Sequence, residues 1–430
     1  MADAPIQILG AGLTGMSAAR HLGADYAIHE RLGHAGGHAI TTEHDGFRFD
    51  RTGHLLHLRD PQMRSWVERL VGDDCVIVQR RSRIWSEGVY TRYPYQANTF
   101  GLPPNTAYEC LMGYFEALKN EPSTPEPTTF EEFCFKYFGA GFSKHFMIPY
   151  NEKLWGIHPR DVTAEWCSRF VPRPKLEDVV AGAVGKNDRE LGYNTSFLYP
   201  SLGIGALPAA MCKELAGPVH YNSAPRGIDW RKRELVFADR RVPYEALIST
   251  APLDVLAGLL IDAPSELVAA SKRLRCNPLY YLDVALDVPC GLDLHWVYVP
   301  EEKYPFYRVG CYSHFSAKMA PPGKANLYIE LSSRKQPDMS TLLPQVKQAL
   351  VEMQLIKRQE DVLFADLQLI DHAYVVYDHN YVGAVTAITP FLEQERIVSA
   401  GRYGGWNYSS MEDALLFGRD AAQKAREWRP

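Results

Sequence analysis

The chain has 430 residues, of which 46% are hydrophobic and 23% charged, and its formal net charge is −5. This composition is typical of a globular protein with a substantial core, and the scattered basic residues argue against nucleic acid or an anionic membrane as partner. No apolar run reaches the length of a membrane span, so we expect no membrane partner. The first predicted strand begins at residue 6, so we expect no signal peptide and a cytoplasmic protein.

Cysteines are dispersed along the chain and form no CxxC pair. This usage predicts reduced thiols and neither a disulfide framework nor a zinc site, so no metal is expected. The eight cysteines are Cys75, Cys110, Cys134, Cys167, Cys212, Cys276, Cys290 and Cys311.

The first thirty residues predict a dinucleotide-binding βαβ unit. An apolar strand over 6–9 enters a glycine turn over 10–15, and a helical pattern follows over 16–22. Gly10 makes the turn, Gly12 lets the backbone approach a pyrophosphate, and Gly15 lets the helix pack on the strand. The N-terminus of this helix favours negative charge. A second strand over 26–29 ends at Glu30, which we expect to accept hydrogen bonds from ribose hydroxyls.

Two further segments favour FAD over NAD, which remains the alternative. Arg31 and the glycine pair Gly36-Gly37 follow the acid and bring backbone amides to a second stretch of an extended cofactor. Near the C-terminus, a strand over 397–399 enters a turn with Gly401 and Arg402, and a helix is predicted over 411–428. The N-terminus of such a helix suits the electron-rich N1–O2 edge of a flavin.

These patterns predict an α/β fold in which the chain enters its domains more than once. We expect a discontinuous FAD-binding Rossmann-type domain, built from residues 1–90, 195–260 and 390–430. A helical domain is inserted over 105–175, with a predicted helix over 141–148. An antiparallel β-sheet substrate domain is expected from 91–104 and 275–385.

Aromatic and polar residues are concentrated in two places. The segment Tyr93-Pro94-Tyr95-Gln96 presents two rings and an amide that could sandwich a planar base and read its edge, with aromatic core packing as the alternative. A strand region with Tyr298 and Arg308 offers phenols and a guanidinium that suit a diphosphate without a metal.

The order of these motifs resembles the UDP-galactopyranose mutase family, its eukaryotic branch in particular, over nearly the whole chain. The resemblance rests on a histidine loop over 53–57, the aromatic segment over 93–98 and a helix over 146–155 with an Asn-x-Lys-x-Trp pattern. It also rests on an order of single residues toward the C-terminus, namely Tyr298, Arg308, Tyr374, Arg402 and Tyr408.

The resemblance implies roles for individual residues. Catalytic roles fall to His54, His57 and Arg308, and the spacing of the two histidines also allows one shared helical face. The cofactor contacts are Gly10, Gly12, Thr14, Gly15, Glu30, Arg31, Gly36, Gly37, His38, Gly53, Gly401, Arg402 and Met411. The substrate contacts are Tyr93, Tyr95, Gln96, Asn98, Asn151, Trp155, Arg173, Tyr298, Arg308, Tyr374 and Tyr408.

The chain departs from the family pattern at a position that grips the diphosphate. The family helix carries an arginine where this chain has Ile148, and we expect Arg169 or Arg173 to replace it from another direction. The segment over 129–133, Thr52 in the histidine loop and the start of the last helix at 411–413 also differ.

The resemblance implies a flavin-dependent mutase that interconverts pyranose and furanose forms of a nucleotide sugar, and we expect that sugar to be UDP-linked. N5 of reduced FAD would attack the anomeric carbon, with NAD(P)H as reductant, and a homo-oligomer is left open. One alternative is an FAD-dependent oxidoreductase of the amine oxidase or protoporphyrinogen oxidase type, which shares this fold. The other is a flavin-binding protein without activity.

Overall fold

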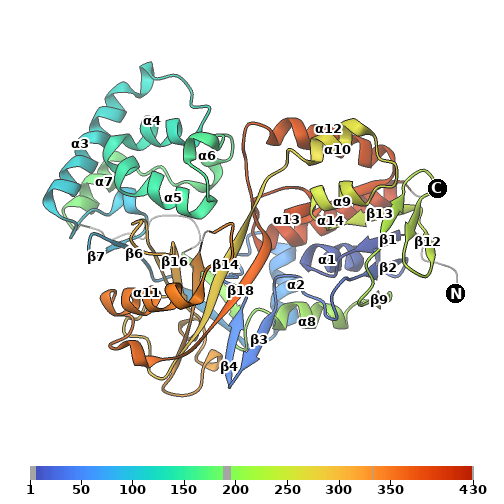
Figure 1. Ribbon diagram of the computed structural model, residues 1–430, viewed down its shortest axis with the longest axis horizontal. Helices are drawn as coiled ribbons and strands as arrows, with labels where there is room; N and C mark the ends of the chain where they lie inside the picture. The colour runs from blue at the N-terminus through green and yellow to red at the C-terminus, as the bar shows by residue number, and fades with distance from the viewer. Residues whose placement is uncertain (1–5, 187–194, 332, 429–430) are drawn as a thin grey trace.

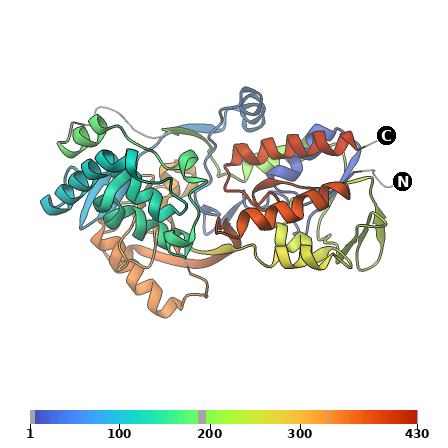
Figure 2. The same ribbon diagram turned by 90° about the horizontal axis from the view of Figure 1, so that it is seen from above.

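The computed structural model describes residues 6–186, 195–331 and 333–428, with the side chains of residues 169 and 170 excepted. Three parts are evident in Figure 1: a parallel-sheet domain, an antiparallel-sheet domain and a helical domain. Seen from above, the helical domain and the parallel-sheet domain lie at opposite ends of the molecule (Figure 2).

The parallel-sheet domain draws its strands from three separate segments of the chain. Their order is β19-β13-β1-β2-β9, and all four neighbouring pairs are parallel. The strands are β1 (Ile6–Leu9), β2 (Tyr26–His29), β9 (Val219–His220), β13 (Ala246–Ser249) and β19 (Ile397–Ser399). Every residue of β1, β2 and β13 is buried, as expected of a parallel sheet covered on both faces.

Helices from both ends of the chain pack on this sheet. Helix α1 (Leu13–Leu22) lies against α14 (Met411–Glu427), and the Ser17 hydroxyl donates to the Leu415 carbonyl at 2.6 Å. The other helices of this domain are α2 (Pro61–Val71), α8 (Ala206–Lys213), α9 (Leu253–Leu259), α10 (Ser265–Ser271), α12 (Tyr381–Gln394) and α13 (Gly401–Gly404).

The antiparallel-sheet domain has seven strands in the order β18-β14-β17-β16-β15-β6-β7. They are β6 (Ser82–Ser86), β7 (Val89–Arg92), β14 (Cys276–Leu286), β15 (Trp296–Tyr298), β16 (Arg308–Cys311), β17 (Ala325–Leu331) and β18 (Val362–Val375), with α11 (Met339–Glu352) packed beside them. Strands β6 and β7 correct the expected boundary at residue 90, because Ser82 and Ile84 pair in parallel with Trp296 and Tyr298 of β15.

The helical domain consists of α3 (Pro104–Asn120), α4 (Phe130–Phe142), α5 (Ile148–Trp155), α6 (Cys167–Phe170) and α7 (Leu176–Ala183). Residues 141–148 are helical as predicted but do not form a separate helix, because α4 runs through a π-helical turn, η3 (Ser143–Met147), into α5. Glycine at 139 and 141 lets helices α3 and α4 approach closely, since a Cβ on Gly139 or Gly141 would collide with the α3 backbone.

Smaller elements complete the description. A hairpin joins β3 (Thr41–His44) to β4 (Phe47–Asp50), and β5 (Cys75–Gln79) pairs antiparallel with β8 (Ser196–Pro200), which is distant in sequence. The short 3-10 turns are η1 (Tyr95–Ala97), η2 (Glu121–Ser123), η4 (Pro159–Asp161), η5 (Tyr312–His314), η6 (Ala317–Met319) and η7 (Gln359–Asp361).

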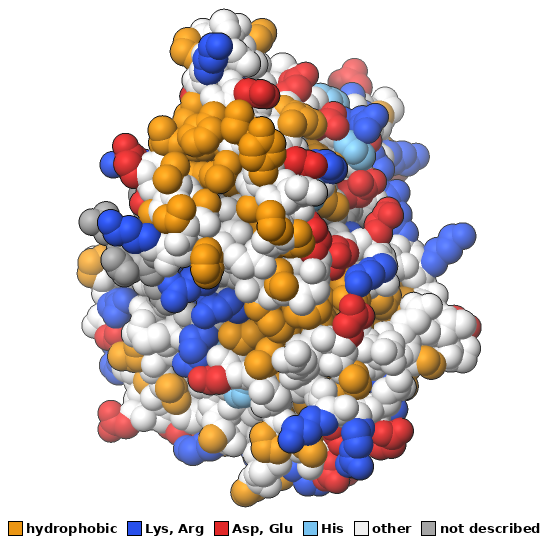
Figure 3. Space-filling model, turned by 90° about the vertical axis from the view of Figure 1, so that its left-hand side faces the viewer, with side chains coloured by type: hydrophobic (Ala, Val, Ile, Leu, Met, Phe, Trp, Pro, Cys, Tyr) orange, Lys and Arg blue, Asp and Glu red, His pale blue; other side chains and the backbone are white. Residues whose placement is uncertain are grey.

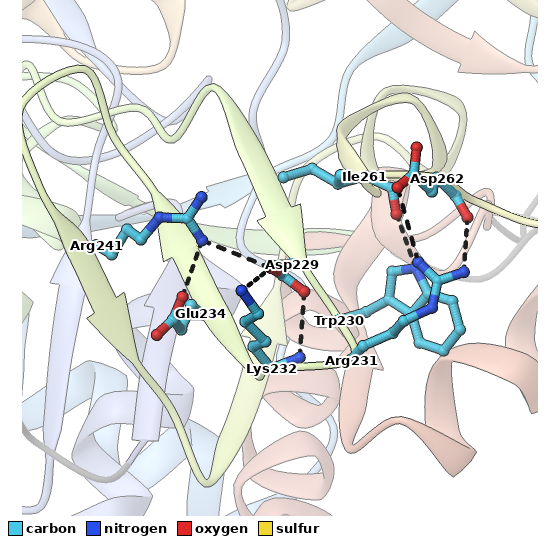
Figure 4. A network of polar contacts seen from close by, with 8 residues as sticks. All are labelled: Asp229, Trp230, Arg231, Lys232, Glu234, Arg241, Ile261 and Asp262. Carbon is cyan, nitrogen blue, oxygen red and sulfur yellow. Dashed lines mark hydrogen bonds and ion pairs between the residues drawn. The ribbon is translucent and has the colours of Figure 1, made fainter.

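A separate three-stranded sheet consists of β10 (Gly227–Asp229), β11 (Glu234–Val236) and β12 (Arg241–Pro243). Figure 4 shows how polar contacts fasten it: Arg241 pairs with Glu234 at 2.9 Å and with Asp229 at 3.5 Å. The Trp230 indole donates to the Ile261 carbonyl at 3.0 Å, which attaches this sheet to the segment after α9.

Hydrophobic side chains gather on the upper part of the face in Figure 3. The exposed large hydrophobic residues of the helical domain and its entry loop include Phe100, Tyr108 and Val184, each more than 60% exposed. Within the described segments, no helix combines the length and the apolar character that crossing a bilayer requires.

Candidate active site

The glycine turn after β1 leaves no space for a side chain at Gly10 or Gly15. Gly10 has φ +99°, a left-handed value that favours glycine, and an added Cβ would collide with the Thr250 hydroxyl. A Cβ on Gly15 would collide with the Gly10 carbonyl, so glycine lets α1 approach β1. Because no side chain caps α1 at Gly12, its first turn has the form of a phosphate-binding helix start.

The second glycine segment lies directly against the first. The Gly36 amide donates to the Ala11 carbonyl at 2.8 Å, and Gly12 and Gly36 form a parallel bridge. A Cβ on Gly37 would lie 3.3 Å from the Cα of Gly12. Two glycine segments distant in sequence therefore present one continuous strip of backbone.

Glu30 is buried and fixes this strip. One carboxylate oxygen accepts from the Ala11 amide at 2.7 Å and the other from the Leu32 amide at 2.8 Å. Each carboxylate oxygen can accept two hydrogen bonds, so both retain capacity for ribose hydroxyls. The following Arg31 is exposed.

The predicted C-terminal turn meets the N-terminal one. Gly401 has φ +88°, and a Cβ there would lie 2.8 Å from the Thr14 hydroxyl oxygen. The Arg402 guanidinium donates to the Ala373 carbonyl at 3.1 Å and the Ser409 carbonyl at 2.7 Å. Met411 is the buried first residue of α14. The starts of α1, α13 and α14 thus converge.

The two candidate catalytic histidines diverge. They lie in a loop over 51–60, so the shared helical face is wrong. The His57 Nδ1 lies 3.0 Å from the Ser196 carbonyl oxygen, whereas the buried His54 Nδ1 has no hydrogen-bond partner. Burial and the Arg402 charge lower the pKa of His54 to about 4, and burial lowers that of His57 to about 4.

Two neighbours tighten the histidine loop. The His38 Nδ1 lies 3.3 Å from the Arg51 guanidinium, and its ring meets Tyr403 edge-on at 5.6 Å. Burial and the Arg51 charge lower the pKa of His38 to about 3, so the ring is neutral at physiological pH. A Cβ on Gly53 would lie 2.8 Å from the Tyr328 hydroxyl, so β17 requires glycine there.

These residues fit a flavin dinucleotide. The glycine strip and the start of α1 suit a pyrophosphate, Glu30 suits a ribose, and the start of α14 suits an electron-rich ring edge. The orphaned Nδ1 of His54 is a buried polar atom that a bound group would satisfy.

Arg308 lies at the junction with the antiparallel sheet. It makes two bonds of 2.6 Å to the carboxylate of Glu330, a side chain with no exposed surface. Burial opposes the Arg308 charge, but the Glu330 carboxylate together with Tyr374 and Tyr328 outweighs it and raises the pKa of Arg308. The Arg308 side chain is nevertheless 22% exposed, so it is not closed off from a ligand.

Tyrosines surround this arginine. The Tyr298 ring lies 5.2 Å from Tyr93, and Tyr374 stacks on Tyr408 at 6.2 Å. Trp155 meets Tyr374 and Tyr408 at 5.8 and 5.9 Å. Arg402 lies 5.0 Å from the Tyr408 ring, which connects the tyrosines to the predicted flavin turn. Five of the expected substrate residues are therefore gathered in one place.

Two expected substrate residues lie elsewhere. Tyr95 is fully buried and stacks on Phe146 at 4.9 Å, because η1 turns it away from Tyr93 into the helical domain. Arg173 pairs with Glu121 at 2.8 Å and lies over the Tyr137 ring at 3.6 Å, within the helical domain. Tyr95 thus follows the core-packing alternative, and the pairing of Arg173 with Glu121 argues against the expected role of Arg173 at the diphosphate. The side chain of Arg169 lies outside the described residues.

The three amide side chains expected to contact the substrate form hydrogen bonds to backbone carbonyls. The side-chain nitrogens of Gln96, Asn98 and Asn151 donate to the carbonyls of Pro172, Pro94 and Met147, at 2.8, 2.8 and 2.7 Å. These bonds position the aromatic segment and α5. The carbonyl oxygens of Gln96 and Asn151 retain acceptor capacity for a base.

A cation that sequence reasoning missed lies beside Tyr93. The Arg80 guanidinium is 5.1 Å from the Tyr93 ring, and its charge, like that of Arg308, acts on the Tyr298 hydroxyl. Ile148, at the position of the family arginine, packs on the apolar core. The only sequence signal for Arg80 was a pair of arginines, at 80 and 81, before a strand.

Sequence reasoning also missed the role of Lys153. Its ammonium donates toward four carbonyls of the β15–β16 loop, those of Val299, Glu301, Tyr304 and Phe306, at 2.5–3.1 Å. Burial lowers the pKa of Lys153 to about 7. This side chain attaches α5 to the loop that joins Tyr298 to Arg308.

The sequence model of flavin-containing amine oxidoreductases matches residues 13–426, so the chain belongs to this family. The expected α/β fold class is thereby confirmed. The crystal structure of a reduced UDP-galactopyranose mutase matches with a TM-score of 0.92 and 25% identity, over 99% of this chain and 96% of that one.

Two further relatives extend the comparison. A probable UDP-galactopyranose mutase of Klebsiella pneumoniae is 26% identical over 201 residues. This match covers 44% of the present chain and 50% of the length of that protein. A putative protoporphyrinogen oxidase from Exiguobacterium matches with a TM-score of 0.74 and 13% identity over 97% of each chain, which shows a shared fold. The expected likeness to the mutases is confirmed.

Proposed function

We propose that this chain binds FAD and, with the flavin reduced, interconverts the pyranose and furanose forms of a UDP-linked sugar. The observation that carries the proposal is the position of Arg308 and its tyrosines beside the converging glycine turns. Its support is the TM-score of 0.92 to a reduced UDP-galactopyranose mutase. Reduced FAD supplies the nucleophile for this chemistry, and the protein holds the substrate.

The diphosphate would lie between Arg308 and Arg80. Glu330 holds the Arg308 fork in one orientation, and Arg80 adds a second positive charge from the side of Tyr93. Burial raises the pKa values of Tyr298 and Tyr374, so both hydroxyls keep their protons and donate to phosphate oxygens. Two guanidinium groups and two phenols would donate hydrogen bonds to the diphosphate without a metal ion.

The remaining groups would orient the two nucleotides. The Tyr93 ring suits stacking on the uracil, and the Gln96 carbonyl oxygen suits its N–H. On the cofactor side, Glu30 would accept from the ribose. His54, neutral at physiological pH, would donate to or accept from the flavin region through the nitrogen that has no protein partner.

The test uses purified flavin-bound protein, reduced with dithionite under nitrogen and incubated with UDP-galactopyranose and, separately, with UDP-glucose. Chromatography should reveal a furanose product with the reduced protein only, without net change in flavin oxidation state. NAD(P)H should replace dithionite as reductant. The matched variant Arg308→Lys keeps the charge but loses the two-pronged bond, and we expect it to retain flavin and lose turnover.

The family match gives the rival function a specific basis, since members are described as amine oxidoreductases. An oxidase would consume oxygen in the presence of amines or porphyrinogens and would give no furanose. Oxygen consumption with a small-molecule substrate, or flavin-loaded protein without any turnover, would overturn the mutase proposal.

A further inference from the structure

Three metal-ligating side chains converge in the antiparallel-sheet domain, apart from the flavin and substrate residues. Cys290 lies in the loop after β14, Cys311 ends β16, and His314 ends η5. Their ligand atoms all lie within 4.8 Å of one another. Throughout 6–186, 195–331 and 333–428, no other group of three His, Cys, Asp or Glu side chains meets this criterion.

The imidazole is oriented as a metal ligand. The His314 Nδ1 lies 2.7 Å from the Leu294 carbonyl oxygen, so Nδ1 carries the proton and Nε2 carries the lone pair. Histidine ligands of metal ions are commonly held in this way by a backbone carbonyl. The Ser313 hydroxyl lies 3.2 Å from the Cys311 sulfur and can donate to a thiolate.

Backbone bonds hold the three segments together. The Gly291 amide, next to Cys290, donates to the Leu355 carbonyl at 2.8 Å, and a Cβ on Gly291 would collide with the Gln354 carbonyl. The Cys311 amide donates to the His295 carbonyl at 2.9 Å. These bonds hold the backbone next to Cys290 and at Cys311 in place.

We propose that Cys290, Cys311 and His314 bind one Zn²⁺ ion, with solvent as the fourth ligand. Thiolate and imidazole select Zn²⁺ over Mg²⁺ or Ca²⁺, which prefer oxygen. Two sulfurs on one tetrahedral zinc are about 3.8 Å apart, given Zn–S bonds of about 2.3 Å. Cys290 and His314 are only half-buried, so water can reach the fourth position.

Zinc binding to these thiols changes no oxidation state, so it needs neither an oxidant nor a reductant. Each thiol loses its proton to solvent as its sulfur binds, so one Zn²⁺ replaces two protons, and the zinc, two thiolates and a neutral imidazole carry no net charge. The ion would clamp the loop over 287–295 to the end of β16 opposite Arg308. This proposal departs from the sequence expectation of no zinc site, because the ligands come from segments with no metal-binding spacing.

The test measures zinc in the flavin-bound full-length protein after incubation with Zn²⁺ and gel filtration. We expect about one zinc per chain, and Cys311→Ser or His314→Gln should weaken binding by roughly tenfold or more in a chelator competition. Cys75→Ser is the matched control and should leave binding unchanged, since Cys75 lies in β5. Flavin absorbance reports whether each variant has folded.

A second measurement needs no variant. Co²⁺ bound to the unmodified protein should produce an intense thiolate-to-cobalt charge-transfer band that Zn²⁺ abolishes. Absence of this band would overturn the proposal. So would equal zinc content in the Cys311→Ser and Cys75→Ser proteins, or a Cys290–Cys311 disulfide, seen as loss of two hydrogens in the intact mass, in protein freshly purified without reductant.

Discussion

Arg308 of β16 and Glu330 of β17 occupy directly paired positions and are joined by two bonds of 2.6 Å. Glu330 has no exposed side-chain surface, so its charge depends entirely on this partner. The pair therefore serves both stability and the orientation of the guanidinium toward a substrate anion.

Removing only Arg308 should be more harmful to stability than removing both partners. Arg308→Met leaves a buried carboxylate unpaired and should lower the free energy of unfolding by about 3–5 kcal/mol. The double variant Arg308→Met, Glu330→Met should recover most of this stability and remain inactive. Denaturant unfolding checks this, and equal loss in the single and double variants would contradict it.

Arg80 and Arg173 should differ sharply in substrate binding. Arg80→Ala should raise the KM for the UDP-sugar by roughly tenfold or more, because a charge-assisted contact contributes about 1.5–3 kcal/mol. Arg173→Ala is the control and should leave KM unchanged, since that side chain pairs with Glu121. Steady-state kinetics separate the two, and a larger effect from Arg173 would refute this assignment.

Alanine substitutions at two glycines with positive φ separate the effect of a steric clash from that of backbone strain. Gly10 and Gly23 have φ +99° and +84°, but an added Cβ at Gly23 would meet nothing within 4 Å. Gly23→Ala should cost about 1–2 kcal/mol of stability and keep the flavin. Gly10→Ala should abolish flavin binding, measured as the ratio of flavin to protein absorbance. Full flavin content in Gly10→Ala would exclude this role for the turn.

Lys153 should act on substrate affinity through the β15–β16 loop. Lys153→Met leaves four loop carbonyls without their donor, and each buried unsatisfied group costs about 1–3 kcal/mol. We expect a raised KM and a lower Tm with flavin content unchanged. Lys303→Met is the control, because its 3.0 Å pair with Glu352 is exposed and contributes less than about 1 kcal/mol. Similar behaviour of both variants would contradict the loop role.

His29 should make the protein sensitive to acid. It bonds Ser223 and Gln7 at 3.0 and 2.9 Å, and burial, with the His220 and Arg240 charges, lowers its pKa to about 4. The unfolded state takes up a proton on His29 near pH 6.5, whereas the folded state does so only near pH 4. The contribution of neutral His29 to the free energy of unfolding is therefore complete above pH 6.5 and is lost as pH falls toward 4. The stability difference between wild type and His29→Asn should shrink over this range in denaturant titrations. A constant difference would disprove the linkage.

Local sequence determined the parts of the fold that depend on neighbours along the chain. The glycine turn over 10–15 with its strand and helix is such a part, because φ, cap and hydrophobic period are properties of adjacent residues. The same holds for the C-terminal strand, turn and helix, although the turn contains the short α13. The α/β class and the likeness to flavin enzymes followed from these units and their order.

Tertiary structure alone decided which side chains share the site. Tyr93 and Tyr95 are two residues apart, yet one lies against Tyr298 and the other against Phe146, because the chain enters the η1 turn at Tyr95. Arg80 reaches the site and Arg173 does not, because β6 pairs with β15 while Arg173 stays with Tyr137. Contacts between residues distant in sequence depend on strand pairing and helix packing, which local patterns do not encode. For this reason Arg308 could be predicted from the sequence, and Arg80 could not.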